Sequence, residues 1–330
     1  MNIILSFFPV LLFLAFLFLL DSFKLVRVNI LILCLFWGVL STLGSYLLNT
    51  FTAKSFSLDF DFLSHYVAPV LEEFLKALFI IYLISRKKIG FMIDAAIYGF
   101  AIGAGFSLVE NIYYLLNNTS LEYNLLIWVI RGFGTAVMHG GCTALLSVLF
   151  ISGLSRSENR LLAFLPGLLL AILLHAGFNF FLVNPVLQTL LIMVLLPAVF
   201  ALVFYFSNSR LQQWLEIEFN SEVELLGMIR KGEFRSTRAG TYLLSLKERF
   251  SPETIVDMYW YIGLYLELSI KAKRNVMLRQ NDFPILVEED LKPMLRELGQ
   301  LRKQIGKTGE IALAPLIRMN YRTLWKLNQL

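Results

Sequence analysis

Long apolar segments alternate with short polar ones over the first two thirds of the chain, and charged residues concentrate in the last third. Because about 20 consecutive apolar residues cross the hydrocarbon core of a bilayer as a helix, this pattern predicts transmembrane helices. We expect about seven of them, near 3–20, 28–49, 64–84, 91–116, 125–152, 161–183 and 187–206.

The last third shows helical periodicity without long apolar runs. Residues from Ser209 to Gly232 form an amphipathic pattern, and Ser251-Pro252 is a helix-start signal. Asn281 to Pro284 is a helix-breaking sequence. We therefore predict an all-α protein: a polytopic membrane helix bundle over 1–206 and a soluble helical cytoplasmic domain over 207–330.

Composition supports this division. The chain has 330 residues, of which 57% are hydrophobic, with a mean hydropathy of +0.68, and these values exclude an ordinary soluble domain. Both cysteines, Cys34 and Cys142, fall inside apolar segments, so we expect no disulfide and no cysteine-based metal site. The net charge of +5 is mild and accompanies no nucleic-acid motif, so no nucleic-acid partner is expected.

Basic residues mark alternate connections between the apolar segments. They are Lys24, Arg27, Arg86, Lys87, Lys88, Arg156, Arg160 and Arg210. The other connections contain only Lys54. Since positive charge favours the cytoplasmic side, we predict a multi-pass protein of the cell membrane with its N-terminus outside and its C-terminal domain in the cytoplasm.

The third apolar segment carries three charged residues, Glu72, Glu73 and Lys76. Each costs roughly 2.5–3.5 kcal/mol near the centre of a bilayer, so together they oppose insertion by roughly 8–10 kcal/mol. Charged residues retained against such a cost usually serve a functional site. The alternative is a simple ion pair between Glu72 and Lys76, which are four residues apart on one helix face; it would leave Glu73 unpaired.

Three further apolar segments carry polar groups at a similar depth. With a rise of about 1.5 Å per residue, Glu110, Arg131, His175 and Asn179 lie within roughly 12 Å of the outer surface, and His139 lies near the midplane. Phe106 and Glu110 share one helix face, as do His175 and Asn179. Their common depth predicts that four neighbouring helices bring these groups to one wet pocket near the outer side.

Such a set suits hydrolysis of a peptide bond in either of two ways. A carboxylate in an apolar environment can act as a general base, while histidine and asparagine stabilise an oxyanion. Alternatively, two histidines and one or two glutamates bind Zn²⁺, and a further glutamate serves as the base. The chain has no His-Glu-x-x-His helix and no Gly-x-Ser-x-Gly sequence.

Four ordered motifs now resemble those of a known family. They are Glu72-Glu73-x-x-Lys76, Phe106-x-x-x-Glu110-Asn111, the lone His139 and His175-x-x-x-Asn179. This set is similar to the PrsW family of membrane proteases, distant relatives of the type II CAAX-prenyl proteases. The resemblance covers about residues 65–183. In the CAAX relatives the second motif ends in histidine, whereas here it ends in Glu110.

The resemblance implies a multi-pass protease that cleaves a membrane-anchored anti-sigma factor on its outer side. It maps the family's glutamate pair onto Glu72 and Glu73, and the essential histidine of the last motif onto His175. We expect Glu72 to be the general base, with Glu73 assisting it or binding metal. The lipid bilayer and a membrane-anchored protein substrate are the expected partners, and the partner of the C-terminal domain is open.

The remaining candidates have supporting or metal-binding roles. His139 and His175 would bind metal or the oxyanion, and Asn179 would support the oxyanion. A zinc-dependent reaction would use Glu110, His139 and His175 as ligands. The supporting residues are Lys76, Phe106, Asn111 and Arg131, of which Lys76 and Arg131 adjust the carboxylates. Two alternatives stay open: a non-catalytic scaffold of a protease complex, and a proton-coupled transporter.

Overall fold

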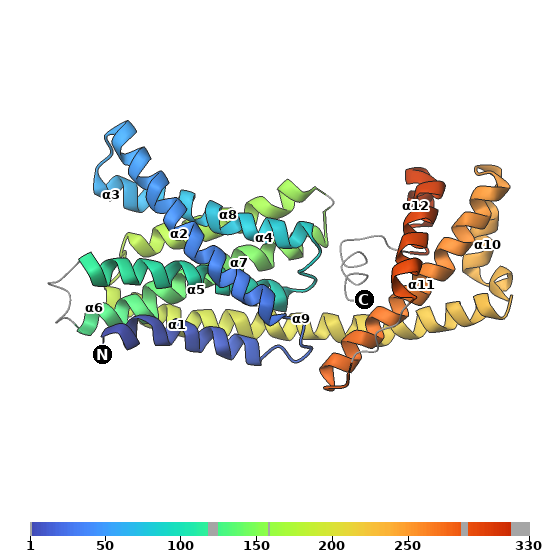
Figure 1. The fold of residues 1–330 in the computed structure, drawn as a ribbon, viewed down its shortest axis with the longest axis horizontal. Coiled ribbons are helices and arrows are strands. Elements are labelled where there is room, and N and C mark those ends of the chain that lie inside the picture. Colours follow the sequence, from blue (N-terminus) through green and yellow to red (C-terminus); the bar gives the residue numbers. More distant parts are fainter. Residues whose placement is uncertain (1, 118–124, 158, 285–289, 318–330) are drawn as a thin grey trace. The chain divides into compact units, whose positions relative to one another are not determined.

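The computed structural model describes residues 2–117, 125–157, 159–284 and 290–317, and every regular element in these ranges is a helix (Figure 1). The predicted all-α membrane fold class is therefore confirmed. The chain divides into two compact units, Met1–Ser207 and Asn208–Leu330, which are described separately below.

The first unit contains a helix at each of the seven apolar segments. The helices are α1 (Asn2–Leu19), α2 (Val28–Phe56), α3 (Phe60–Phe62), α4 (Ala68–Ser85), α5 (Met92–Asn117), α6 (Leu125–Val129), α7 (Ala136–Leu154), α8 (Arg160–Asn179) and the start of α9 (Pro185–Arg230). Five of the described helices, namely α2, α5, the α6–α7 segment, α8 and α9, are long and apolar enough to cross a membrane. The number of seven crossings stays a prediction, since α1 and α4 are not among these five and α4 carries three charges.

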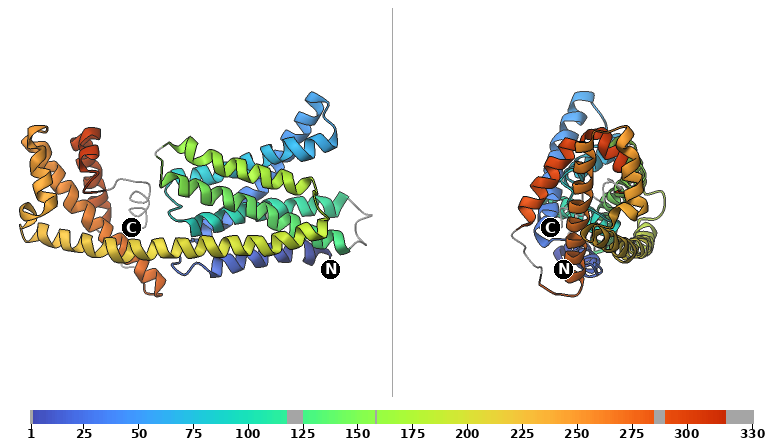
Figure 2. Two further views of the ribbon diagram at one scale, coloured as in Figure 1. Left: turned by 180° about the vertical axis from the view of Figure 1, so that it is seen from behind. Right: turned by 90° about the vertical axis from the view of Figure 1, so that its right-hand side faces the viewer.

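Helix α5 lies at the centre of the bundle, between α2 and α7 (Figure 2). All of its residues from Ile93 to Ser107 are buried, as expected for a helix that is apolar on every side. Glycines permit this close packing. A Cβ atom at Gly103 would lie 2.1 Å from the carbonyl oxygen of His139, and one at Gly105 would lie 2.1 Å from that of Leu35. The backbones of α2 and α7 therefore both touch α5.

Two π-helical turns interrupt the helices that carry the charged groups. The segment η1 (Leu63–Val67) runs directly into α4, and η3 (Ile130–Thr135) joins α6 to α7. Pro69 follows η1 and lacks an N–H group, so the regular hydrogen-bond ladder cannot continue there. Arg131 lies within η3. Single π-helical turns often occur at functional sites, where they redirect side chains.

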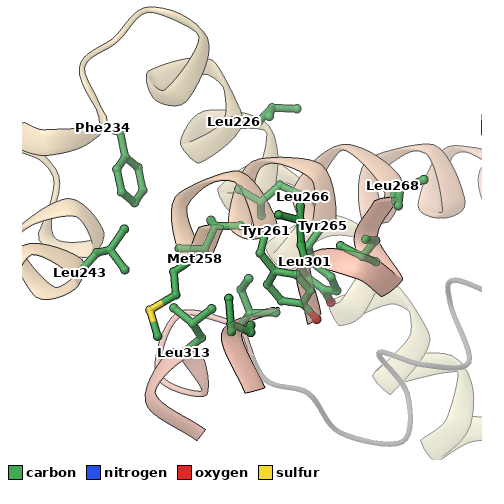
Figure 3. Packing of buried hydrophobic residues seen from close by; sticks show 14 of the residues in the cluster. Leu226, Phe234, Leu243, Met258, Tyr261, Tyr265, Leu266, Leu268, Leu301 and Leu313 are labelled. Atoms are coloured by element: carbon green, nitrogen blue, oxygen red, sulfur yellow. The ribbon is translucent and has the colours of Figure 1, made fainter. Parts of the chain in front are cut away.

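The described residues of the second unit form α-helices and short 3₁₀ turns. Its elements are the end of α9, η4 (Phe234–Ser236), α10 (Arg238–Ser245), η5 (Leu246–Glu248), α11 (Pro252–Gln280) and α12 (Leu291–Leu313). Its core gathers around α11, where Met258, Tyr261 and Leu313 point toward one another (Figure 3). The hydroxyl group of Ser251 accepts a hydrogen bond from the backbone N–H of Thr254. Ser251 is therefore the N-cap of α11, as its sequence predicts.

One expectation for the tail is corrected. The helix predicted from Ser209 is not separate but continues the last apolar segment as part of α9. No glycine or proline lies between residues 198 and 226, so nothing in the local sequence ends the helix there. The predicted break after Gln280 is confirmed, because α11 ends at that residue.

Candidate active site

Glu73 lies at the centre of a buried polar cluster in the first unit. Its carboxylate is inaccessible to solvent, and its Oε1 atom lies 2.7 Å from Lys76 Nζ and 2.9 Å from His175 Nδ1. Thr143 Oγ1 lies 3.4 Å from the second oxygen and 3.2 Å from the carbonyl oxygen of His139, so its single proton can go to either acceptor. These partners come from α4, α7 and α8. The Glu73 carboxylate thus contacts side chains of the protein and not solvent.

His139 on α7 bridges Lys76 and Glu110. Its Nδ1 atom lies 2.9 Å from Lys76 Nζ, and its Nε2 atom lies 3.0 Å from Glu110 Oε2. Because an ammonium group can only donate, Nδ1 must accept and Nε2 must carry the ring proton. The Phe106 ring covers this contact, with its centroid 4.0 Å from Lys76 Nζ and 4.9 Å from the His139 ring.

Glu110 is held from its other side by Arg131. The Arg131 Nη2 atom lies 3.4 Å from Glu110 Oε1, and Arg131 Nε donates to Asn111 Oδ1 at 3.0 Å. Asn111 Nδ2 in turn donates to the carbonyl oxygen of Ser6 at 2.9 Å, which ties α1 to the site. The guanidinium of Arg131 also stacks over the Tyr114 ring at 3.6 Å. Arg131 therefore positions Glu110 rather than extending toward the lipid.

Glu72 is the carboxylate whose neighbours are an imidazole and an amide. Its Oε2 atom lies 3.8 Å from His175 Nε2, and Asn49 Nδ2 donates to its Oε1 atom at 3.4 Å. Its side chain is 14% exposed, whereas that of Glu73 is fully buried. Lys76 makes its close ion pair with Glu73, so the alternative ion pair between Glu72 and Lys76 is not what the helix forms.

Glu72, His139 and His175 form the group that could hold a metal ion. One ligand atom from each residue lies within 4.8 Å of the others. The zinc set expected from the sequence has Glu110 in place of Glu72 and stays a prediction. The packing of η3 and α7 brings the Glu110 carboxylate into contact with Arg131 and with the Nε2 atom of His139.

The donor chemistry of this group fits a divalent cation. His175 donates Nδ1–H to the buried Glu73, which leaves the Nε2 lone pair directed toward Glu72. A carboxylate behind a histidine in this way is the usual support of a metal-bound imidazole. His139 can join the set by exchanging its contact with Lys76 or Glu110 for the cation.

Asn179 makes a different contact from the one that its proposed role requires. Its Nδ2 atom donates to the backbone carbonyl oxygen of Ser64 at 2.9 Å. The backbone carbonyl oxygen of Asn179 lies 3.1 Å from His65 Nε2. It therefore joins the end of α8 to η1. The oxyanion role of Asn179 stays a prediction.

Sequence reasoning missed two residues of the cluster. Thr143 lies four residues after His139 on the same helix face, so helical spacing could have identified it. Asn49, a polar residue in the second apolar segment, carries no spacing signal that connects it to Glu72. Only the packing of α2 against α4 brings Asn49 and Glu72 together.

A helix bundle that brings together three carboxylates and two histidines from four apolar helices has the features of an intramembrane hydrolase. Residues 27–220, more than half of the chain, match the family described as PrsW family intramembrane metalloprotease. The chain belongs to this family, and the resemblance seen in the four motifs is confirmed. Searches of curated proteins and of solved structures found no match.

Proposed function

We propose that this protein is an endopeptidase that cleaves a membrane-anchored protein near its extracytoplasmic side, with Glu72 as the carboxylate that activates water. One observation carries the proposal. Glu73 is paired with Lys76 and Glu110 with Arg131, while Glu72 faces the imidazole of His175. A carboxylate without a neighbouring cation keeps its basicity for proton transfer.

The other polar residues position the reacting groups. Glu73 fixes the orientation of His175, and Lys76 holds Glu73 and His139 together. Glu110 accepts a hydrogen bond from Nε2–H of His139 and so stabilises that tautomer, and Arg131 holds Glu110 in place. With its Nδ1–H donated to Glu73, His175 keeps the Nε2 lone pair facing Glu72, where it can bind a metal ion.

The family's metal would be held by His139 and His175, with Glu72 close enough to contact a water molecule bound to it. A divalent cation bound there would polarise the carbonyl group and lower the pKa of a bound water molecule. Glu73 would then support His175 from behind, as its hydrogen bond to Nδ1 already indicates. The identity of the cation, with zinc as the first candidate, is part of the proposal.

The finer features of the substrate rest on the family resemblance and on the predicted orientation. A single-span anti-sigma factor, cut on its outer side to begin regulated proteolysis, fits both. The positive-inside pattern places the start of α4 and the end of α8 on the outer side, and the polar cluster lies within a few helical turns of both ends.

Glu72→Gln tests the reaction directly. New N-termini of membrane proteins would be compared by mass spectrometry in cells that make the wild-type protein, Glu72→Gln or the matched control Glu297→Gln, whose carboxylate is exposed on α12. We expect the dependent N-termini to fall at least about 100-fold in Glu72→Gln only. Undiminished cleavage in Glu72→Gln would end the proposal.

Metal analysis tests the donor group independently of the substrate. The purified wild-type protein should contain a divalent cation, and the double variant His139→Ala/His175→Ala should lose it. A Glu72/Glu73 double glutamine variant that rescued every phenotype of a gene deletion would instead support the scaffold alternative.

A further inference from the structure

A groove of about 540 Å³ opens beside the active site, between α7, α8 and α9. Its volume is within the range of about 300–1,000 Å³ that is usual for ligand pockets. The lining is almost wholly apolar, with Met138 and Cys142 from α7 and Leu174 from α8. Met138 directly precedes His139, and Leu174 directly precedes His175. The groove therefore adjoins the two helices that carry the histidines of the site.

Two glycines line this groove, and they differ in what surrounds them. A Cβ atom at Gly141 would lie 2.8 Å from Leu196 Cδ1, so α9 already covers that position. A Cβ atom at Gly177 on α8 would meet nothing within 4 Å. Small residues let a neighbouring helix approach closely in a membrane. Gly177 thus leaves open space for a further apolar segment two residues after His175.

The polar residue of the lining is Gln188, near the start of α9. Its Nε2 atom donates to the carbonyl oxygen of Phe178 at 2.8 Å. Its Oε1 atom is buried and has no hydrogen-bond donor among the described residues. A buried acceptor without a donor is costly, and an acyl chain cannot supply one. A polypeptide can, through a backbone N–H group or a polar side chain.

We propose that this groove binds the transmembrane segment of the protein substrate before cleavage. This inference rests on the proposed protease function and names the surface that selects the substrate. One apolar face of the incoming segment packs over Gly177 and the α9 leucines, as a helix does in a hydrophobic groove. Near its outer end, an N–H group of the segment reaches Gln188 Oε1. The next residues of the substrate then lie beside His175 and His139.

Gly177→Phe tests the groove by filling it. The added side chain meets open space, so the helix bundle should fold and retain its metal content. We expect the cleavage that depends on Glu72 to fall at least tenfold. Leu169→Phe is the matched control, because Leu169 lies on the same helix, is 57% exposed and does not line the groove. Wild-type cleavage by a folded Gly177→Phe protein would overturn the proposal.

Photo-crosslinking identifies the occupant without requiring cleavage. A photoreactive side chain would replace Leu191, which lines the groove, or Leu202, which is exposed elsewhere on α9, in the Glu72→Gln background. The probes are the cell's own single-span proteins. We expect position 191 to capture the same proteins whose new N-termini depend on Glu72, and Gly177→Phe to abolish the capture.

The two arms separate the possible failures. Capture of lipid alone at position 191, or equal capture of proteins at positions 191 and 202, would overturn the docking proposal whether or not cleavage occurs. If cells with the wild-type protein and with Glu72→Gln showed the same N-termini, the protease function would be overturned. Specific capture of proteins at position 191 in the same cells would leave the docking proposal standing.

Discussion

Replacing Lys76 by methionine removes the cation that joins three elements of the site. The ammonium group lies 2.7 Å from Glu73 Oε1, 2.9 Å from His139 Nδ1 and 4.0 Å from the centroid of the Phe106 ring, and it is fully buried. Methionine approximates the length of lysine, so the change leaves little empty space. It leaves the Glu73 carboxylate buried without its cation.

The expected loss follows from this burial. Removing one partner of a buried ion pair costs about 3–5 kcal/mol, because the remaining charge cannot reach water. The hydrogen bond from His175 to Glu73 persists and places the loss toward the lower end of that range. The second change Glu73→Gln removes the stranded charge. We therefore expect the double variant Lys76→Met/Glu73→Gln to recover about 1–3 kcal/mol relative to the sum of the two single changes.

The assay is unfolding of the purified protein in bicelles, combined with cleavage of a membrane-anchored substrate. Lys76→Met should lower both stability and cleavage, whereas the double variant should recover stability without recovering cleavage, since the Nδ1 atom of its His175 faces an amide instead of the Glu73 carboxylate. Lys76→Arg keeps the charge but enlarges a fully buried side chain, and should cost about 1–3 kcal/mol through overpacking. A Lys76→Met protein as stable as the wild type, or a double variant worse than the sum of the single changes, would refute this reasoning.

Four further predictions concern the rest of the chain. Gly306 in α12 has φ 66° and ψ 177°, a region that only glycine adopts readily, so Gly306→Ala should destabilise the second unit by about 1–3 kcal/mol in urea unfolding. Gly299→Ala in the same helix should instead stabilise it by up to about 1 kcal/mol; equal effects at both glycines would contradict the backbone argument. Gly103→Ala would place a Cβ atom 2.1 Å from the His139 carbonyl oxygen, so it should lower thermal stability in detergent and reduce cleavage. Burial raises the pKa of Asp21, in the connection after α1, to about 6, so its contribution to stability is largest below pH 4 and is lost as the pH rises through 6. Asp21→Asn should remove this decline, which a thermal-unfolding series from pH 4 to 8 would detect. A cysteine placed at the exposed Ser221 of α9 should react with an impermeant thiol reagent only from the cytoplasmic side; labelling from outside would reverse the predicted orientation.

The sequence by itself determined the helices and pointed to a candidate site. Apolar runs of about 20 residues predict helices because backbone groups in lipid must bond within their own segment. The cost of burying Glu72, Glu73 and Lys76 in such a run indicated function before any geometry was known. The order of the four motifs indicated the family that the comparison confirms.

Only the tertiary structure decided how the polar groups pair. On a single helix Lys76 could bond with Glu72 or with Glu73, since residues three and four apart both lie within reach. The structure chooses Glu73, because α7 and α8 present His139 and His175 to the same side. The same packing brings Glu110 into contact with Arg131 and places Glu72 near His139 and His175. Local periodicity places a side chain on a helix face, but the partner that it meets depends on which neighbouring helix packs against that face and in which register.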